Sequence, residues 1–368
     1  MISRVAENCF WLGRYLERAE STARVLGVTH NLALDAELPP EQCWRPVLIT
    51  AGEEPSFLER FGADALEDPA QVEAYMTWDD ANLSSVVCSA RALRENARSI
   101  RDVVSLDAWE AINDLYLYLR GERGRADWVD HRQGFYTRVR SGTQLALGLM
   151  RSTMLHDLGL DFIWLGVMLE RAAQTARLLD VHHHALAGAP GAVESAVWLT
   201  ILRACSGFEP FMKRARGQVG GRAVASFLLL EAQFPRSIRY CVHAANSRLN
   251  AIRPPEHVEY PGAESAARLR ALDAWVAKLG ADAMDAGRAH DVLTRVVDEI
   301  AGVCMELGRE LFGVAEAPAP APAPAAVTVA APAVAATQSQ SQSQSQSQSQ
   351  SSADATPAPA AGSESPQG

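Results

Sequence analysis

The sequence predicts an all-α fold, a helical bundle built from two pseudo-symmetric halves. Apolar residues recur with helical spacing along most of the chain, and no convincing alternating strand pattern is present. Residues 10–28, FWLGRYLERAESTARVLGV, and residues 163–181, IWLGVMLERAAQTARLLDV, match at 12 of 19 positions without a gap. This repeat predicts that two related helices open two related halves of the chain.

The composition separates a folded region from a tail. Residues 314–368 hold an Ala-Pro run, a Gln-Ser repeat at 338–351 and very little charge. Such a segment cannot bury enough apolar surface to offset its chain entropy, which predicts a disordered tail. Residues 1–313 are then expected to form one helical domain, with internal halves at about 1–153 and 154–313.

The first half is expected to hold helices separated by proline, glycine and capping residues. A helix over Ile2–Val28 is followed by a shorter extension, His30–Leu38, which stops at two prolines. Ser105 is expected to cap a helix over Leu106–Arg120, with a turn at Gly121 and Gly124. The other helices are expected at 41–50, 55–61, 69–77, 82–104 with Asn82 as the N-cap, and 126–155.

The second half restarts with a helix over Asp161–His183, the copy of the first helix. Further helices are expected at 193–216, 221–230, 235–252, 261–279 and 284–312. Three matched pairs keep the offset of 153 that relates the repeated segments: Ser84/Ser237, Cys88/Cys241 and Ala92/Ala245. Their spacing of four places them on one helix face, which supports the duplication.

The repeated helix carries a polar line at the edge of an apolar stripe. The stripe, which predicts the core contact, consists of Leu12, Leu16, Ala19, Ala23 and Leu26 in the first copy. The polar line consists of one glycine, one glutamate and one arginine per copy: Gly13, Glu17, Arg24 and Gly166, Glu170, Arg177. A glycine inside a helix costs about 1 kcal/mol relative to alanine, so both glycines indicate close approach of another helix or room for a ligand.

The charged residues of the polar line have three interpretations. A glutamate and an arginine seven positions apart do not easily bridge each other, so each is expected to pair with another helix. The first interpretation is a structural network of crossed ion pairs between two pseudo-symmetric helices. The second is a pocket in which Glu17, Arg24, Glu170 and Arg177 converge on a polar ligand, and the third is a surface decoration or a surface that faces a partner.

Two further patterns have ordinary structural explanations. Arg91, Glu95, Arg98 and Asp102 are spaced to share one helix face, where a solvated charge ladder is the default and a partner-binding or pocket-rim stripe is the alternative. His30 and the run 182–184 lie near predicted helix C-termini, where histidine interacts favourably with the last carbonyl groups.

The sequence argues against several classes of function. The net charge of −10 disfavours a nucleic-acid partner. No Glu-x-x-His pair, phosphate-binding loop, dinucleotide fingerprint, nucleophile elbow or H-E-x-x-H motif is present, so no metal or cofactor is expected.

The cell compartment is predicted from cysteine usage and the lack of membrane segments. No apolar run of 18 residues is present, so no membrane span is expected. Charges near the N-terminus leave no signal-peptide core, and six scattered cysteines without a C-x-x-C motif favour reduced thiols in the cytoplasm.

Several segments together resemble the bacterial alpha-E domain family over residues 1–313. They are MISRVAEN, WLGRYLERAE and TAR in the first copy, RALRENARSIRD at 91–102, WEAIN at 109–113, the second LERA at 169–172, and FPRSIR at 234–239. The resemblance implies an all-helical domain encoded beside, or fused to, a circularly permuted ATP-grasp protein similar to peptide or amide ligases. Transglutaminase-like peptidases often accompany this pair, which implies a role in peptide synthesis or processing.

The resemblance also assigns candidate site residues. The residues on the family motif are Glu17, Arg18, Arg24, Glu170, Arg171 and Arg177, with Arg14 beside the first glycine. The second copy departs from the family pattern because Val167 stands where an arginine is common. A second tier comes from the other matching segments: Arg91, Glu95, Arg98, Arg101, Arg236 and Arg239.

These observations favour a non-catalytic binding module that works with an ATP-grasp ligase-like protein, a peptide ligand and a transglutaminase-like peptidase. One alternative is a hydrolase or transferase that acts on peptides. In that case Glu17 or Glu170 would be the general acid or base, and Arg24 or Arg177 would clamp a carboxylate. A purely structural helical scaffold is the other alternative.

Overall fold

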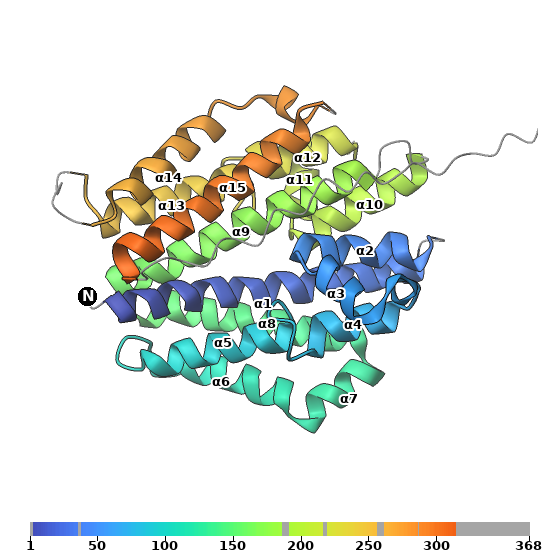
Figure 1. Ribbon diagram of the computed structural model, residues 1–368, viewed down its shortest axis with the longest axis horizontal. Coiled ribbons are helices and arrows are strands. Elements are labelled where there is room, and N and C mark those ends of the chain that lie inside the picture. Colours follow the sequence, from blue (N-terminus) through green and yellow to red (C-terminus); the bar gives the residue numbers. More distant parts are fainter. Residues whose placement is uncertain are drawn as a thin grey trace, which may run out of the picture. The chain divides into compact units, whose positions relative to one another are not determined.

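The computed structural model describes residues 3–35, 38–185, 191–215, 219–255, 261–285 and 287–313. These residues form helices joined by short connections, and no strand occurs among them (Figure 1). The predicted all-α class is therefore confirmed. The tail predicted at 314–368 lies outside the described residues.

Two long helices form the centre of the fold. Helix α1 (Ser3–Asp35) packs along helix α9 (Leu158–Ala185), and these are the two copies of the repeated segment (Figure 1). The break predicted near Val28 is wrong, since α1 continues without interruption through the buried Thr29. Every residue of the predicted apolar stripe of α1 is buried.

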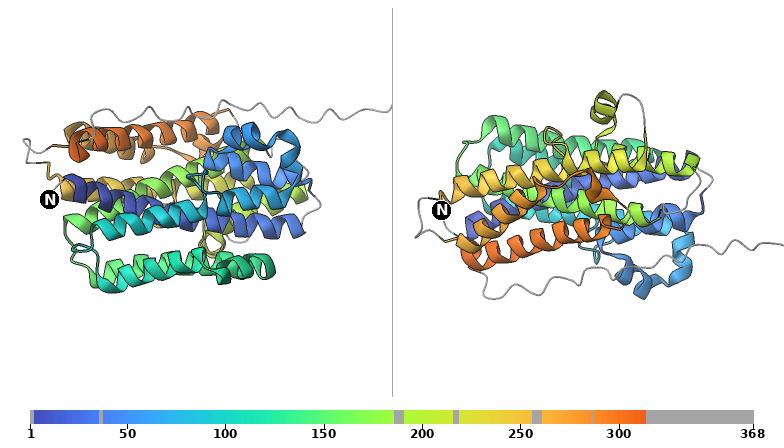
Figure 2. Two further views of the ribbon diagram at one scale, coloured as in Figure 1. Left: turned by 60° about the horizontal axis from the view of Figure 1, so that its bottom comes forward. Right: turned by 90° about the horizontal axis from the view of Figure 1, so that it is seen from above.

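In each half, two helices pack on the central helix, and a third packs on those two. Helices α5 (Val86–Ser99) and α8 (Arg132–Thr153) pack on α1, and α6 (Leu106–Arg120) packs on both of them. In the second half, α13 (Ile238–Ile252) and α15 (Ala289–Leu307) pack on α9, and α14 (Ala263–Val276) packs on both (Figure 2). The two sets of contacts correspond, while a duplication of the whole halves stays a prediction.

The remaining elements lie between these helices along the chain, and the last of them follows α15. In the first half they are α2 (Pro40–Ala51), α3 (Glu54–Phe61), the 3₁₀ helix η1 (Ala63–Glu67), α4 (Pro69–Trp78) and α7 (Glu122–Asp130). In the second half they are α10 (Gly191–Ala204), α11 (Phe208–Ala215), α12 (Gly221–Leu230), the 3₁₀ helix η2 (Ala281–Met284) and the π-helical turn η3 (Gly308–Phe312).

Serine side chains determine where several helices begin. Ser105 Oγ accepts a hydrogen bond from the Ala108 amide, as predicted for the start of α6. The start predicted at Asn82 is wrong, because Ser85 caps α5 and accepts from the Cys88 amide. Asn82 is buried instead in the preceding turn, where its Nδ2 donates to the Tyr75 carbonyl oxygen.

Two long helices predicted from periodicity are each divided into two. The helix expected at 126–155 breaks at His131 between α7 and α8. Gly124 lies inside α7 rather than in the predicted turn. Glycine is needed at this position because a Cβ would overlap the Tyr118 carbonyl oxygen of α6. The helix expected at 193–216 breaks at Ser206, which adopts a positive φ of 51° between α10 and α11.

The buried side chains form two apolar clusters, and α1 contributes to both. Leu12 and Leu16 belong to the larger cluster, which includes α9, α13 and α15. Ala23 and Leu26 belong to the smaller cluster with residues of α2, α4 and α8. No described helix combines the length and the apolar character that crossing a lipid bilayer requires.

Candidate functional site

The closest approach of α1 and α9 is at the two repeated glycines. A Cβ on Gly13 would overlap the Ile163 carbonyl oxygen, and a Cβ on Gly166 would overlap the Phe10 carbonyl oxygen. Residues 10 and 163 are related by the same offset of 153 as the glycines, so the two contacts are reciprocal. Both helices therefore need glycine here because of backbone packing.

One turn beyond Gly13, Glu17 is surrounded by guanidinium groups from the second half. Glu17 is 1% exposed and accepts hydrogen bonds from Arg171 Nε at 2.9 Å and Arg171 Nη2 at 2.6 Å. Arg236 Nη1, from the turn before α13, donates to the same carboxylate at 2.8 Å. This arrangement is a bidentate ion pair with a second guanidinium on the remaining side.

Glu170 has the corresponding environment on α9. It is also 1% exposed, and it accepts from Arg18 Nε at 2.8 Å and Arg14 Nε at 2.5 Å. The pairs Glu17–Arg171 and Glu170–Arg18 are related by the repeat offset, so each Glu-Arg dipeptide binds the other. The glutamates therefore pair across the helices, but not with the arginines seven positions away.

The arginines determine the charge of both glutamates. Burial alone disfavours the ionised form, but Arg171 and Arg236 outweigh it and lower the pKa of Glu17. In the same way Arg14 and Arg18 overcome burial and hold the pKa of Glu170 well below its usual range. Both carboxylates are therefore ionised at neutral pH.

Glu20 is a third buried carboxylate of the site, and the sequence analysis missed it. It accepts from Arg24, from Arg236 Nη2 at 2.7 Å and from Gln144 Nε2 at 3.2 Å. Arg236 therefore joins Glu17 to Glu20. The repeat concealed Glu20 because Ala173 occupies its position in the second copy, whereas its spacing of four from Arg24 is a signal that was available.

Arg24 and Arg177, the equivalent last arginines of the two motifs, lie among other positive charges. Burial, with Arg236 and Arg140, lowers the pKa of Arg24. Burial lowers the pKa of Arg177 too, and Arg14 and Arg18 add to the effect. The surroundings of both arginines therefore disfavour their charged form.

The second-tier residues other than Arg236 lie outside this network. Arg91 pairs with Asp80 rather than with Glu95, while Glu95 pairs with Arg98 and Arg94. Arg98 is 64% exposed in its side chain, and Arg101 lies over the Trp109 ring. Arg239 is half-buried in the first turn of α13. Of the charge ladder predicted on this face, the described residues show only the Glu95–Arg98 pair.

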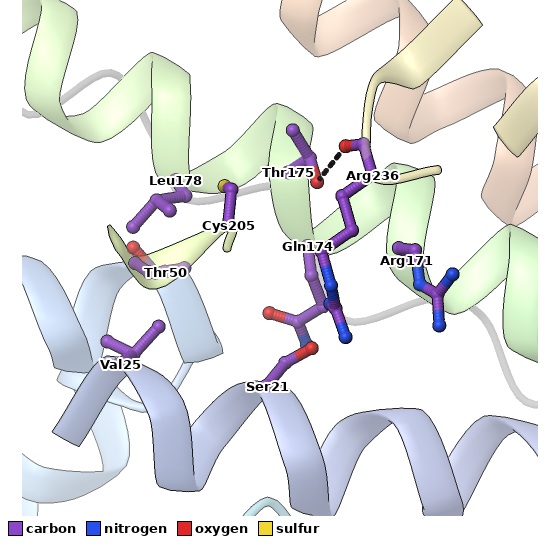
Figure 3. A pocket seen from close by; sticks show the side chains of 10 residues that line it. Ser21, Val25, Thr50, Arg171, Gln174, Thr175, Leu178, Cys205 and Arg236 are labelled. Atoms are coloured by element: carbon purple, nitrogen blue, oxygen red, sulfur yellow. Dashed lines mark hydrogen bonds between the residues drawn. The ribbon is translucent and has the colours of Figure 1, made fainter. Parts of the chain in front are cut away.

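A small cavity lies beside the network between α1 and α9. It has a volume of about 20 Å³, and Arg171, Gln174 and Arg236 form its polar side together with Ser21 (Figure 3). Cys205 and Thr50 close the opposite side, where the Thr50 hydroxyl is buried and has no hydrogen-bond partner among the described residues. The side chains of Arg236 and Gln174 extend toward Ser21 on α1.

His182 lies in the last turn of α9, as predicted, with its Nδ1 2.9 Å from the Leu178 carbonyl oxygen. The position predicted for His30 near a helix end is wrong, because α1 continues to Asp35 and His30 Nδ1 lies 3.7 Å from Glu73 Oε1. The side chains of residues 183 and 184 lie outside the described part. Within the described residues, no group of three or more His, Cys, Asp or Glu side chains is arranged to hold a metal ion.

Comparisons of the sequence with known proteins identify one family. The model of the Alpha-E family, described as "a predicted alpha-helical domain with a conserved ER motif", matches residues 1–312. Uncharacterised proteins from Mycobacterium bovis and from two strains of Mycobacterium tuberculosis are 26% identical over 257 residues, which cover 64% of this chain. The chain spans 28% of the length of these relatives, and no solved structure matches it. The chain therefore belongs to the Alpha-E family, and its two Glu-Arg dipeptides, Glu17-Arg18 and Glu170-Arg171, bind each other where α1 crosses α9.

Proposed function

We propose that this chain is a non-catalytic binding module that works with an ATP-grasp amide ligase in peptide synthesis or processing. The observation that carries the proposal is the state of the two motif glutamates. Each is 1% exposed, ionised and hydrogen-bonded by two arginines, both of which come from the other half of the chain. A carboxylate in this state holds the surrounding guanidinium groups in fixed positions.

The enzyme alternative fits this geometry less well. A general acid at neutral pH needs a raised pKa, whereas the pKa of Glu17 and that of Glu170 are both lowered. A general base needs a free lone pair within reach of a substrate, whereas these oxygens are already bonded to guanidinium groups inside the protein. Binding of a ligand by the arginines that surround these glutamates requires neither a raised glutamate pKa nor a free carboxylate oxygen.

The ligase partner is inferred from the family resemblance and from the relatives. Because the matched region is 28% of each mycobacterial protein, the Alpha-E part there is one segment of a much longer chain. That arrangement suits a domain whose role depends on a neighbouring protein or domain. The six cysteines are unpaired thiols, five of them buried, which suits the reducing cytoplasm that we propose as its location.

The test is reconstitution with an ATP-grasp ligase-like protein of the kind that the family resemblance implies as a partner. We expect the two proteins to co-purify, and ligase turnover to rise when the chain is added in stoichiometric amounts. The Glu170→Gln variant, compared at equal amounts of folded protein, should lower turnover only in proportion to lost complex. Turnover abolished in an intact complex would make Glu170 a chemical participant, and absence of any complex would leave the scaffold alternative.

A further inference from the structure

The two copies of the repeat differ by one carboxylate. In the first copy Arg24 is paired with Glu20, four residues earlier on α1. In the second copy Ala173 stands at the position of Glu20. Arg177, the equivalent of Arg24, therefore has no carboxylate four residues earlier on α9, and the second copy is one negative charge short of the first.

The part of the chain that the structure describes offers Arg177 no replacement for this partner. Its side chain has no hydrogen bond or ion pair with the described residues. Asp180, three residues later on α9, is paired with His290, whose Nδ1 lies 2.9 Å from Asp180 Oδ1. Glu170 is close enough to act on the charge of Arg177, but its oxygens accept hydrogen bonds from other side chains. A half-buried cation in this state favours a ligand that supplies acceptors.

Three guanidinium groups share one carboxylate on this side of the crossing. Glu170 binds Arg14 and Arg18, and Arg177 adds a third positive charge within electrostatic range of all three. Cys304 Sγ, which accepts from Arg14 Nη1 at 2.7 Å, does not compensate, because burial raises the pKa of its thiol and keeps it neutral. Three positive charges against one negative charge leave two in excess.

These arginines reach the surface of the protein beside two aromatic side chains. The side chains of Arg14 and Arg18 are 13% and 20% exposed, and Arg177 is half-buried. Trp11 and Tyr15 of α1 are half-buried too, with Arg14 Cζ 5.6 Å from the centre of the Trp11 ring and Arg18 Cζ 5.4 Å from that of Tyr15. Arginine, tryptophan and tyrosine are the residues enriched where protein partners bind most strongly, so this surface suits a protein segment.

We propose that Arg177, with Arg14 and Arg18, binds the carboxylate side chain of an acidic segment in a partner protein. The inference rests on the proposed binding role and names the chemistry of the partner that this role requires. The first copy indicates the ligand, because there the side chain of Glu20 pairs with the equivalent arginine. A carboxylate supplies acceptors for the N–H groups of Arg177 and removes one of the two excess charges.

The test titrates the full chain, without any ligase, with three N-acetylated tripeptides at constant ionic strength. The amide of Ala-Glu-Ala carries only a side-chain carboxylate, the free acid of Ala-Gln-Ala only a terminal one, and the amide of Ala-Gln-Ala neither. Calorimetry should detect saturable binding of the first, and binding weaker by about tenfold or more for the other two. Arg177→Gln should weaken binding of the first peptide by a similar factor. The matched control is Arg222→Gln, because Arg222 is 63% exposed on α12 and should bind like the unmodified chain.

A second variant copies the first half of the chain into the second. Ala173→Glu places a carboxylate four residues before Arg177, so it should abolish peptide binding with Arg177 still present, and it replaces Arg177→Gln if that variant does not fold. Equal binding of the three peptides, preference for the terminal carboxylate, tighter binding of inorganic phosphate, or unchanged affinity in either variant would each overturn the proposal. A ligase complex that forms normally with Arg177→Gln would remove this inference and leave the proposed function. Binding of the glutamate peptide without a ligase complex would do the reverse.

Discussion

At the scale of single residues, the chemistry of the site follows from two glutamates that arginines keep ionised. Glu17 and Glu170 receive bidentate or paired guanidinium donors, and their burial makes each pair sensitive to loss of one partner. The arginines in turn depend on the glutamates, because without them the excess of positive charge at the crossing would be larger.

Replacing either motif glutamate should destabilise the protein strongly. Glu17→Gln removes the charge that balances Arg171 and Arg236, and breaking a buried pair on one side costs about 3–5 kcal/mol. Urea unfolding followed by circular dichroism measures the loss. The control is Glu95→Gln, whose side chain is 44% exposed on α5 and should change stability by about 0.5 kcal/mol or less.

The same glutamates predict acid sensitivity. Their pKa values are lowered in the folded protein, so the unfolded chain takes up protons first as the pH falls through about 4.3. Their contribution to stability is therefore complete above that pH and is lost progressively below it, down to the lowered folded pKa values. Unfolding free energies measured from pH 6 to pH 3 should fall more steeply for the unmodified chain than for Glu170→Gln. Parallel curves would contradict the assignment.

At the scale of helices, the crossing of α1 and α9 depends on glycine. Gly13→Ala and Gly166→Ala should each destabilise the fold by about 3 kcal/mol, because the new methyl group meets a backbone carbonyl that cannot rotate away. Gly148→Ala on α8 is the matched control, since a Cβ there meets nothing within 4 Å and alanine is the better helix former. We expect it to stabilise by about 0.5–1 kcal/mol in the same urea assay. A loss for Gly148→Ala equal to that for Gly13→Ala would show that the crossing is not close-packed.

Helix positions were predictable where a local signal exists, and some failures occurred where packing decides. Ser105 before Leu106 is a capping signal, and α6 begins there. Asn82 has the same capability, but its amide donates to the Tyr75 carbonyl oxygen, a contact that depends on the position of α4. The break at Ser206 was missed although local signals were available, since Gly207 follows it directly and Pro210 lies in the first turn of α11.

The candidate site was predictable in composition but not in connectivity. The repeat singled out Glu17, Arg24, Glu170 and Arg177, because only a duplicated segment presents the same residues twice. That Glu17 pairs with Arg171 rather than with an equivalent of Arg24 depends on the crossing geometry at the glycines. The contributions of Arg236, in the turn before α13, and of Arg140, on α8, cannot be revealed by helix spacing along α1 and α9.

At the scale of the whole molecule, α1 and α9 join the two halves, and each of them carries the three long helices of its own half. The interface combines a close glycine crossing with two reciprocal ion pairs, so charge and shape specify the same register of α1 against α9. Arg24 and Arg177 add to this interface at a cost, since burial and neighbouring guanidinium groups lower the pKa of each.

The tail should contribute nothing to the stability of this body. The Ala-Pro and Gln-Ser composition of residues 314–368 offers almost no apolar side chain large enough to pack. A chain that ends at Gly313 should therefore melt at the same temperature as the full chain, as measured by differential scanning calorimetry. A clear fall in melting temperature would show that the boundary is misplaced.

The most direct test of the central claim is a double-mutant cycle between Glu17 and Arg171 in urea unfolding. The variants are Glu17→Gln, Arg171→Gln and the pair together, measured at pH 7. If the two halves are joined through this buried pair, the double variant should lose less than the sum of the single losses, with a coupling energy of about 2 kcal/mol. Single losses that add to within about 0.5 kcal/mol would contradict the account, because they would mean that Glu17 and Arg171 do not act on each other.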